Sequence, residues 1–410
     1  MSENMPLPFN PRSPEFRANP YPTYDYLRTH HPIYYRTEGR DWVLTRYADM
    51  VEVLHNRSFG HPESLPPHPI QGHNLLDRFL SLRFSSQRLM RLWVILSNPP
   101  THTRIRQLFQ NSFTIGQVQT WRSQIQTEAD RLIAGFEGLE RIDIMSDLAY
   151  PLTMYGICQI LGILPEERHP QFPQWSHDLS SIIDLDVSAL DNERGLLAIA
   201  NFAEYFRNWI SKDRNPSQPH NHLISTLIKA QAEGQLSEEE LLGNLILMFF
   251  AGHSTTKYLI GNSVLALLNH PEQLHLLQAN PDSIQMAIAE VLRYDNPVQF
   301  ISRTAFSDIQ LSNQTIAQGQ VVHCILAAGN RDPAQFPNPN TFDIRRKPNP
   351  HLSFGQGIHI CLGKHLAQLV AEISVSTLVC HFPKLSLATE SLEWEETFLV
   401  RGLKSLPVVL

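Results

Sequence analysis

The sequence contains few cysteines, no excess of positive charge and no long apolar run, and each of these features argues against a class of protein. Four cysteines in 410 residues follow no paired spacing, which argues against a disulfide framework and favours the cytoplasm as the location. A formal net charge of -7 leaves no broad basic field, so we expect no nucleic-acid partner. No apolar run reaches the roughly 18 residues that cross a bilayer, and residues 1–22 are polar and proline-rich. We therefore expect neither a signal peptide nor a membrane anchor.

One cysteine, Cys361, stands in a glycine-rich segment directly before an apolar helical pattern. Gly355, Gly357 and Gly363 allow tight turns and a close approach to a flat partner around one sulfur atom. The apolar residues of 366–378 recur at helical spacing, so the positive end of a helix would lie beside the sulfur and stabilise a thiolate. A lone cysteine is more often just a small buried residue. Here the spacing favours a metal ligand.

A second segment, 237–269, predicts one very long helix. Ser237 and Glu240 form a capping box at its start, and no proline interrupts it, so it would extend for roughly 50 Å. Its middle, 245–250, is apolar on all sides, which is typical of a buried helix and favours one domain over two. The polar run 251–256 follows, where a threonine hydroxyl could bond a carbonyl four residues back and loosen the helix. A harmless kink is the alternative interpretation.

Two pairs of polar residues have helical spacing elsewhere in the chain. His102 and Arg106 stand four apart after two prolines, and two such donors can bind a carboxylate. Glu290 and Arg293 stand three apart and can form an ion pair. Solvated surface is the simpler interpretation of both pairs.

The remaining segments predict short strands and a loop. Segments 33–36 and 42–45 predict a hairpin, 321–327 predicts a strand, and the proline-rich stretch 61–72 predicts a loop. Alternation over 297–305 predicts a strand. Its two faces would carry, on one side, Val298, Phe300 and Ser302 and, on the other, Gln299, Ile301 and Arg303.

Four of these segments resemble, in the same order, the motifs of the cytochrome P450 family of haem-thiolate monooxygenases. Residues 353–367 match the haem-binding pattern Phe-Gly-x-Gly-x-His-x-Cys-x-Gly-x-x-Leu-Ala at every fixed position. Residues 99–106 resemble the family's proline-proline-x-His-x-x-x-Arg helix, 251–256 its oxygen-binding motif, and 290–293 its Glu-x-x-Arg motif.

The resemblance covers most of the chain from about residue 20 and implies the family's fold. That fold is mainly α with smaller β-sheets (α+β), a triangular helical prism around a long central helix. We accordingly expect a single domain over 1–410, with a short N-terminal extension over 1–19, and we expect a monomer.

The resemblance also implies haem b as the cofactor, with the Cys361 thiolate as the axial ligand of its iron. It assigns haem or propionate contacts to His102, Arg106, Arg303, Phe354, Gly355, His359 and Gly363. It assigns the oxygen-binding groove to Ala251, Gly252, Ser254 and Thr255, with Thr255 as the residue that delivers protons to dioxygen. The family usually has an acid where this chain has Ser254, which puts efficient proton delivery in doubt, and His253 is expected to be structural. Glu290 and Arg293 receive a structural role against a loop near 336–342 and Arg345.

The implied reaction is insertion of one oxygen atom from O2 into an apolar organic substrate, by hydroxylation or epoxidation. Electrons would come from a separate ferredoxin and its reductase, docked near Cys361 on Arg104, Lys364, His365 and the basic run 345–347. A substrate cavity is expected from Leu247, Phe250, Val298, Phe300 and Phe398, although the same residues could be core. Two alternatives stay open: a peroxide-dependent or isomerising haem-thiolate enzyme, which Ser254 favours, and a non-catalytic haem-binding sensor.

Overall fold

The computed structural model describes residues 9–62, 75–212, 222–389 and 391–410. The chain divides into two compact units. Unit 1 comprises Met1–Gly60, Gln124–Leu152 and Thr255–Leu410, and unit 2 comprises His61–Ser123 and Thr153–Ser254. The division falls inside the long helix α12 (Glu238–Asn269), so that helix contributes to both units. The single domain over 1–410 stays a prediction.

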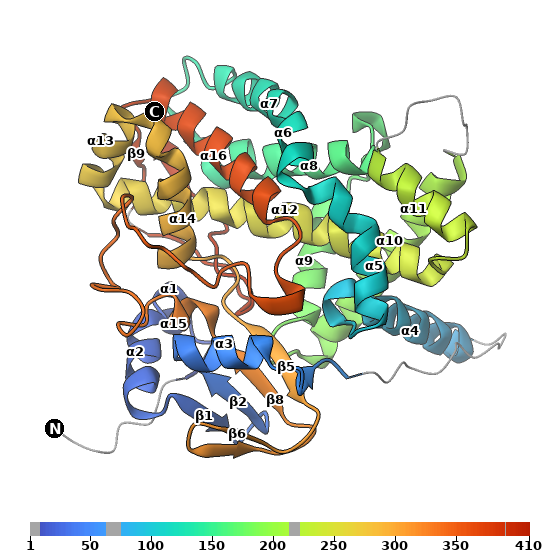
Figure 1. Ribbon diagram of the computed structural model, residues 1–410. Coiled ribbons are helices and arrows are strands. Elements are labelled where there is room, and N and C mark those ends of the chain that lie inside the picture. Colours follow the sequence, from blue (N-terminus) through green and yellow to red (C-terminus); the bar gives the residue numbers. More distant parts are fainter. Residues whose placement is uncertain (1–8, 63–74, 213–221, 390) are drawn as a thin grey trace. The chain divides into compact units, whose positions relative to one another are not determined.

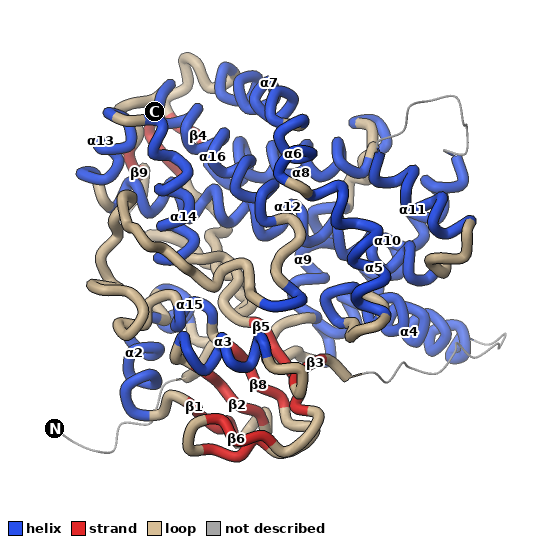
Figure 2. The backbone as a smooth tube through the Cα atoms, viewed as in Figure 1, coloured by secondary structure: helices blue, strands red, loops and turns tan. Residues whose placement is uncertain are grey.

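Unit 1 contains a five-stranded sheet, drawn in red in Figure 2, in the order β1-β2-β8-β5-β3. Its strands are β1 (Ile33–Arg36), β2 (Asp41–Leu44), β8 (Val321–Cys324), β5 (Ile301–Ala305) and β3 (Phe59–Gly60). The predicted hairpin is confirmed, because β1 and β2 pair in antiparallel fashion. The β2–β8 pair is parallel, and β5 runs antiparallel to β8 with Ser302 opposite His323.

Two smaller sheets and a set of helices complete unit 1. One sheet has the order β4-β10-β9, and the other is the β6–β7 pair. Their strands are β4 (Arg141–Asp143), β10 (Pro407–Val409), β9 (Ser386–Leu387), β6 (Ile309–Leu311) and β7 (Gln314–Ile316). The helices are α1 (Pro14–Ala18), α2 (Tyr21–His30), α3 (Tyr47–His55), α13 (Pro271–Ala279), α14 (Ile284–Tyr294), α15 (Leu326–Gly329) and α16 (Lys364–His381). Helix α15 packs against α2 and α3, and α14 packs against α16.

Both strands predicted near the sheet are shorter than expected. The strand over 297–305 begins only at Ile301, because the backbone before it pairs elsewhere: the Gln299 amide donates to the Leu399 carbonyl at 2.9 Å, and Val298 forms an antiparallel bridge with Val400. The strand over 321–327 ends at Cys324, where the buried chain turns into α15.

Unit 2 is helical, and α10 packs against α9 and α4 within it. Its helices are α4 (Leu75–Arg91), α5 (Thr101–Gln110), α6 (Ile115–Thr120), α9 (Phe172–Ile182), α10 (Ala189–Lys212) and α11 (His222–Ala232). Helix α8 (Tyr150–Leu161) belongs to unit 2 from Thr153 onward, and α7 (Arg122–Ala134) belongs to unit 1 from Gln124 onward. Helix α10 begins at Ala189, because the hydroxyl of Ser188 accepts a hydrogen bond from the Asp191 amide at 3.1 Å and caps the helix. Most of the loop predicted over 61–72 lies outside the described residues.

Helix α12, the long yellow helix in Figure 1, confirms the predicted start and length. The Ser237 amide donates to Glu240 Oε2 at 2.9 Å, and the Glu240 amide donates to Ser237 Oγ at 3.1 Å, which is the capping box. Residues 245–250 are buried apart from the partly exposed Met248. Among the helices that the structure describes, including this one, none is long and apolar enough to cross a membrane.

Candidate functional site

The Cys361 segment of unit 1 is a turn whose two ends are joined by a backbone hydrogen bond. The Cys361 amide donates to the Phe354 carbonyl at 2.8 Å, and the short 3-10 helix η6 (Gly357–His359) lies between these two residues. Helix α16 begins three residues after the cysteine, at Lys364. Cys361 is exposed, and both Phe354 and His359 are partly exposed. The segment therefore presents its sulfur at an accessible surface of unit 1.

The three glycines of this segment serve different purposes. Gly357 has φ +72°, and a Cβ there would lie 2.3 Å from the Leu54 carbonyl oxygen, so both its conformation and its contact require glycine. Gly355 has φ +64°, but a Cβ would meet only an Ile301 methyl at 3.6 Å. Gly363 has an ordinary φ of -83°, and a Cβ there would point into open space. Space beside Gly355 and Gly363 is thus available to a flat group.

The other cysteines differ in accessibility or local sequence from Cys361. Cys158 and Cys324 are fully buried, and burial raises the pKa of their thiols to about 11 and about 12. Cys380 is exposed, but it lies at the far end of α16 without a glycine loop. A reactive thiolate needs access and a stabilising environment, and Cys361 is the cysteine with both access and a helix start beside it in sequence.

Arg303 on β5 is a buried cation of unit 1. The residue is only 7% exposed, and its Nη1 donates to the Ser302 carbonyl at 2.8 Å. Burial lowers the pKa of the guanidinium from its ordinary value. A guanidinium in such surroundings binds a carboxylate by strong charge-assisted hydrogen bonds. Arg303 therefore suits a haem propionate, and the exposed Cys361 and the open glycine backbone suit the iron and the macrocycle.

The sheet also brings together four polar residues that were not predicted to belong to any site. Ser302 Oγ lies 2.7 Å from His323 Nδ1, and His323 Nε2 lies 3.1 Å from Asp41 Oδ2. Arg36 donates to both oxygens of Asp41, at 2.7 and 2.9 Å. Burial alone would raise the pKa of Asp41, but the hydrogen bonds from Arg36 and His323 lower it to about 2. This chain of contacts stabilises β5 next to Arg303.

Helix α12 has one accessible face within its otherwise buried middle. Ala251 is exposed, and Gly252 and Thr255 are partly exposed, at the spacing of one helical turn. In unit 2, a Cβ on Gly252 would lie 2.4 Å from Ile157 Cδ1, so this glycine allows α8 to pack closely. Ser254 is buried beside this face, at 7% exposed.

His253 behaves as the structural histidine that the sequence predicts. It is 2% exposed, and its Nδ1 lies 2.7 Å from the Phe249 carbonyl oxygen one turn earlier in α12. Its ring also contacts the Phe249 ring at 5.1 Å.

In unit 2, His102 and Arg106 lie one turn apart on α5, as predicted. His102 is 3% exposed and Arg106 is partly exposed. Arg104 on the same helix is ion-paired with Glu240 at 2.5 Å. A local carboxylate therefore balances the charge of Arg104, and its contribution to a positive docking surface stays a prediction.

The Glu290–Arg293 pair is fully buried, with both side chains 0% exposed and the charged atoms 2.7 Å apart. Arg293 also donates to the carbonyls of three residues in the following loop, at 2.7 to 3.0 Å: Asn330, Pro339 and Thr341. These contacts agree with the predicted pairing and support a structural role for both residues. The third member of the network is Arg346, at 3.2 Å from Glu290, and not the predicted Arg345, which is exposed and lies 3.7 Å from Asp343. Arg346 is likewise no free charge for docking.

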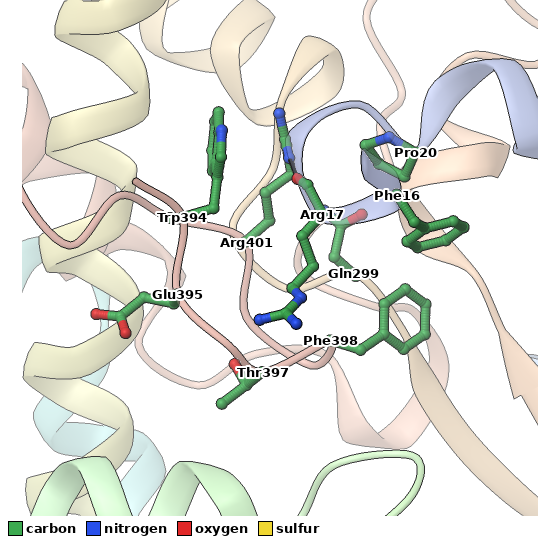
Figure 3. A pocket seen from close by; sticks show the side chains of 10 residues that line it. Phe16, Arg17, Pro20, Gln299, Trp394, Glu395, Thr397, Phe398 and Arg401 are labelled. Atoms are coloured by element: carbon green, nitrogen blue, oxygen red, sulfur yellow. Dashed lines mark hydrogen bonds between the residues drawn. The ribbon is translucent and has the colours of Figure 1, made fainter. Parts of the chain in front are cut away.

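Two of the predicted substrate contacts lie in an aromatic cluster of unit 1. The Phe300 and Phe398 rings stack at 5.1 Å, and Phe398 also contacts Phe16 at 5.7 Å. Figure 3 shows Phe16 and Phe398 side by side at a small cavity of about 20 Å³, which has room for about one water molecule. Val298 is partly exposed, whereas Leu247 and Phe250 on α12 are each 4% exposed. The role of these five residues as substrate contacts stays a prediction.

Comparison with known proteins gives consistent matches. A family model described as Cytochrome P450 matches residues 82–400. The biotin biosynthesis cytochrome P450 of Bacillus subtilis is 37% identical, over 97% of this chain and 97% of its own length. The vitamin D(3) 25-hydroxylase of Pseudonocardia autotrophica is 35% identical, over 96% of this chain and 94% of its own. The crystal structure of P450BioI in complex with hexadec-9Z-enoic acid ligated acyl carrier protein aligns with a TM-score of 0.87 at 36% identity, over 97% of this chain and 99% of that one.

Proposed function

Because this chain belongs to the cytochrome P450 family, we propose that it inserts one oxygen atom from O2 into a long-chain acyl substrate. The protein is a cytochrome P450 monooxygenase with haem as its cofactor and a cysteine thiolate as axial ligand, and it has the family's mainly helical fold, as predicted. When bound, the haem supplies the oxygen activation, since thiolate ligation favours cleavage of the O–O bond. The exposed Cys361 on its glycine loop carries the proposal.

Cys361 is the proposed thiolate ligand. Its exposure and the accessible space beside Gly355 and Gly363 support this role, and the buried Cys158 and Cys324 lack both features. The test is the carbon monoxide difference spectrum of Cys361→Ser, which is expected to lose the thiolate-type band. Cys380→Ser, which removes the other exposed cysteine, is the matched control and is expected to keep the band. A normal spectrum of Cys361→Ser contradicts the assignment.

The remaining haem contacts follow from the same resemblance. Arg303 would bind a propionate, and its burial beside β8 supports that role. His102 and Arg106 of α5 are proposed as propionate ligands as well. Backbone and side-chain contacts to the macrocycle are proposed for Phe354, Gly355, His359 and Gly363.

The proposed substrate class rests on one relative. The aligned crystal structure, 36% identical to this chain, holds a hexadec-9Z-enoic acid on acyl carrier protein. We therefore expect hexadec-9Z-enoyl acyl carrier protein to shift the Soret band and spin state at lower concentration than either the free fatty acid or vitamin D3. Should vitamin D3 shift the spectrum while the acyl carrier conjugate does not, the substrate is a free lipid, such as the relative from Pseudonocardia suggests.

Proton supply is assigned to the accessible face of α12. Thr255 on this face would pass protons to the reacting oxygen, and Ser254 beside it cannot store a proton near neutral pH. We expect Thr255→Ala to consume electrons without product and to release peroxide, measured as the ratio of product to reductant. Unchanged coupling in this variant shows that the proton route does not pass through Thr255. Ser254→Asp is expected to keep or improve coupling.

A second candidate is a peroxide-dependent haem-thiolate enzyme, and Ser254 is the observation that favours it. The buried hydroxyl replaces the usual acid. Product formation with ferredoxin, its reductase and O2, but not with peroxide alone, removes this candidate. A complete lack of turnover with every electron source and peroxide favours the haem-binding sensor.

The electron donor is proposed to be a ferredoxin that docks near Cys361. Lys364 and His365, at the partly exposed start of α16, are the remaining residues of the predicted docking group in this segment. Reduction rates insensitive to both ionic strength and Lys364→Glu exclude this docking site. The cytoplasm stays the proposed location, because the four cysteines, all of them described, form no disulfide.

A further inference from the structure

Unit 2 contains a cavity of about 600 Å³ whose lining residues all come from 166–209. It lies among the loop around the 3-10 helix η4 (Pro165–Glu167), the beginning of α9 and the middle of α10. Its volume falls within the roughly 300 to 1,000 Å³ that is typical of small-molecule sites. Neither the Cys361 segment nor the accessible face of α12 contributes to its lining.

Aromatic rings form one part of the cavity lining, and polar contacts hold them in place. The His169 and Trp175 rings stack at 4.4 Å with an interplanar angle of 22°. Trp209 Nε1 donates to Glu167 Oε2 at 3.3 Å, and the Tyr205 hydroxyl donates to the Glu167 carbonyl at 3.2 Å. Burial raises the pKa of the Tyr205 phenol well above its ordinary value, so this ring stays neutral. The aromatic lining is therefore ordered before any ligand arrives.

The charged side chains that line the cavity are all negative, and Arg168, next to Glu167 in the chain, lies outside the lining. Three glutamates line the cavity, and its described lining includes no lysine or arginine. Glu166 and Glu204 are exposed, and neither forms an ion pair with any residue in the described part of the chain. The nearby Arg207 is directed to Glu238, at 3.1 Å. Arg207 therefore does not neutralise the negative charge of the cavity lining.

We infer that this cavity binds an organic cation, an amine or quaternary ammonium group attached to an apolar or aromatic body. Aromatic faces attract such cations through their quadrupole, most strongly when water is partly excluded. The carboxylates of Glu166 and Glu204 attract the cation as well, and the partly exposed His169 ring, which stacks on the buried Trp175, accommodates the apolar body. The site is separate from the oxygen chemistry and does not depend on the identity of the acyl substrate.

The test is isothermal titration calorimetry of the haem-loaded enzyme with benzyltrimethylammonium chloride. We expect saturable one-to-one binding that weakens about threefold in Glu204→Gln and about tenfold in Glu166→Gln/Glu204→Gln, since each exposed carboxylate contributes modestly. Glu193→Gln is the matched control, because it removes a carboxylate from the same helix α10 outside the cavity. Benzyl alcohol, with the ring but without the charge, is expected to bind about tenfold more weakly than the cation.

Three results overturn the inference. The first is the absence of saturable heat, and the second is equal affinity in the wild type and the double variant. The third is a shift of the Soret band on binding, together with competition by the acyl substrate, which places the cation in the active site. Because the readout is binding heat with an unchanged haem spectrum, failure of the proposed acyl oxidation leaves this test interpretable.

Discussion

Alanine substitutions at the three glycines of the Cys361 segment are expected to have graded effects on stability. Gly357→Ala forces a left-handed backbone and places Cβ 2.3 Å from the Leu54 carbonyl oxygen, which α3 holds in place. The left-handed conformation costs about 1 kcal/mol. The overlap adds about 2 kcal/mol, because backbone atoms must shift to relieve it. We therefore expect about 3 kcal/mol of destabilisation in total.

The other two substitutions separate these contributions. Gly355→Ala retains the left-handed conformation without the overlap, so about 1 kcal/mol is expected. Gly363→Ala has neither, and as the N-cap of α16 it is expected to cost about 0.5 kcal/mol, because alanine caps a helix less well than glycine.

Guanidinium unfolding followed by far-ultraviolet circular dichroism measures the order of the three variants. Loss of Soret absorbance in the same titration reports separately on haem release. Equal destabilisation by Gly357→Ala and Gly363→Ala refutes the reasoning, and so does a wild-type midpoint for Gly357→Ala. A double substitution, Gly357→Ala with Gly355→Ala, is expected to cost at least the sum of the two, since the positions are too close to relax independently.

Three more substitutions test contacts within the units. Glu290→Gln leaves a fully buried arginine without its counter-charge, so the free energy of unfolding in denaturant is expected to fall by about 3 to 5 kcal/mol. Arg345→Ala, at an exposed position, is expected to lower it by less than about 1 kcal/mol. Equal costs contradict the buried network. Asp41→Asn is expected to lower the free energy of unfolding by about 2 kcal/mol at pH 7, because the pKa of Asp41 is lowered from 3.8 to about 2 in the folded protein. In the wild type, this contribution to stability is present above about pH 4 and disappears as the pH falls towards 2. A pH-independent difference between the two proteins argues against this origin. Gly252→Ala is expected to cost about 1 to 3 kcal/mol by overlap with Ile157 Cδ1, and Ile157→Val, which removes that atom, is expected to restore part of the loss. Purely additive losses exclude the overlap.

Interactions between residues close in sequence were predicted well. Ser237 and Glu240 stand three residues apart, and their capping box forms as expected at the start of α12. Glu290 and Arg293 also pair as predicted, since i and i+3 positions meet on any helix. Such predictions succeed because a helix determines the distance between its own residues, whatever surrounds it.

Predictions that required a partner from elsewhere in the chain were less accurate. The loop arginine that joins the Glu290 network is Arg346, and its neighbour Arg345 is exposed, because the turn around Asp343 decides which side chain points inward. The ion pair between Arg104 and Glu240 of α12 was not predicted. The strand at 297–305 starts late, because the backbone of Val298 and Gln299 pairs with residues 399–400.

The sequence by itself determined the family, the haem chemistry and the position of Cys361, because the spacing of a few glycines, a histidine and one cysteine within fifteen or so residues already specifies a local structure. Only the tertiary structure decided why each glycine is needed: Gly357 lies against the Leu54 carbonyl, Gly252 lies against Ile157, and Gly363 lies against nothing among the described residues. It also decided that a cavity lined by aromatic rings and three glutamates exists in unit 2. These features depend on contacts between segments that are distant along the chain, and packing, not local spacing, brings such segments together.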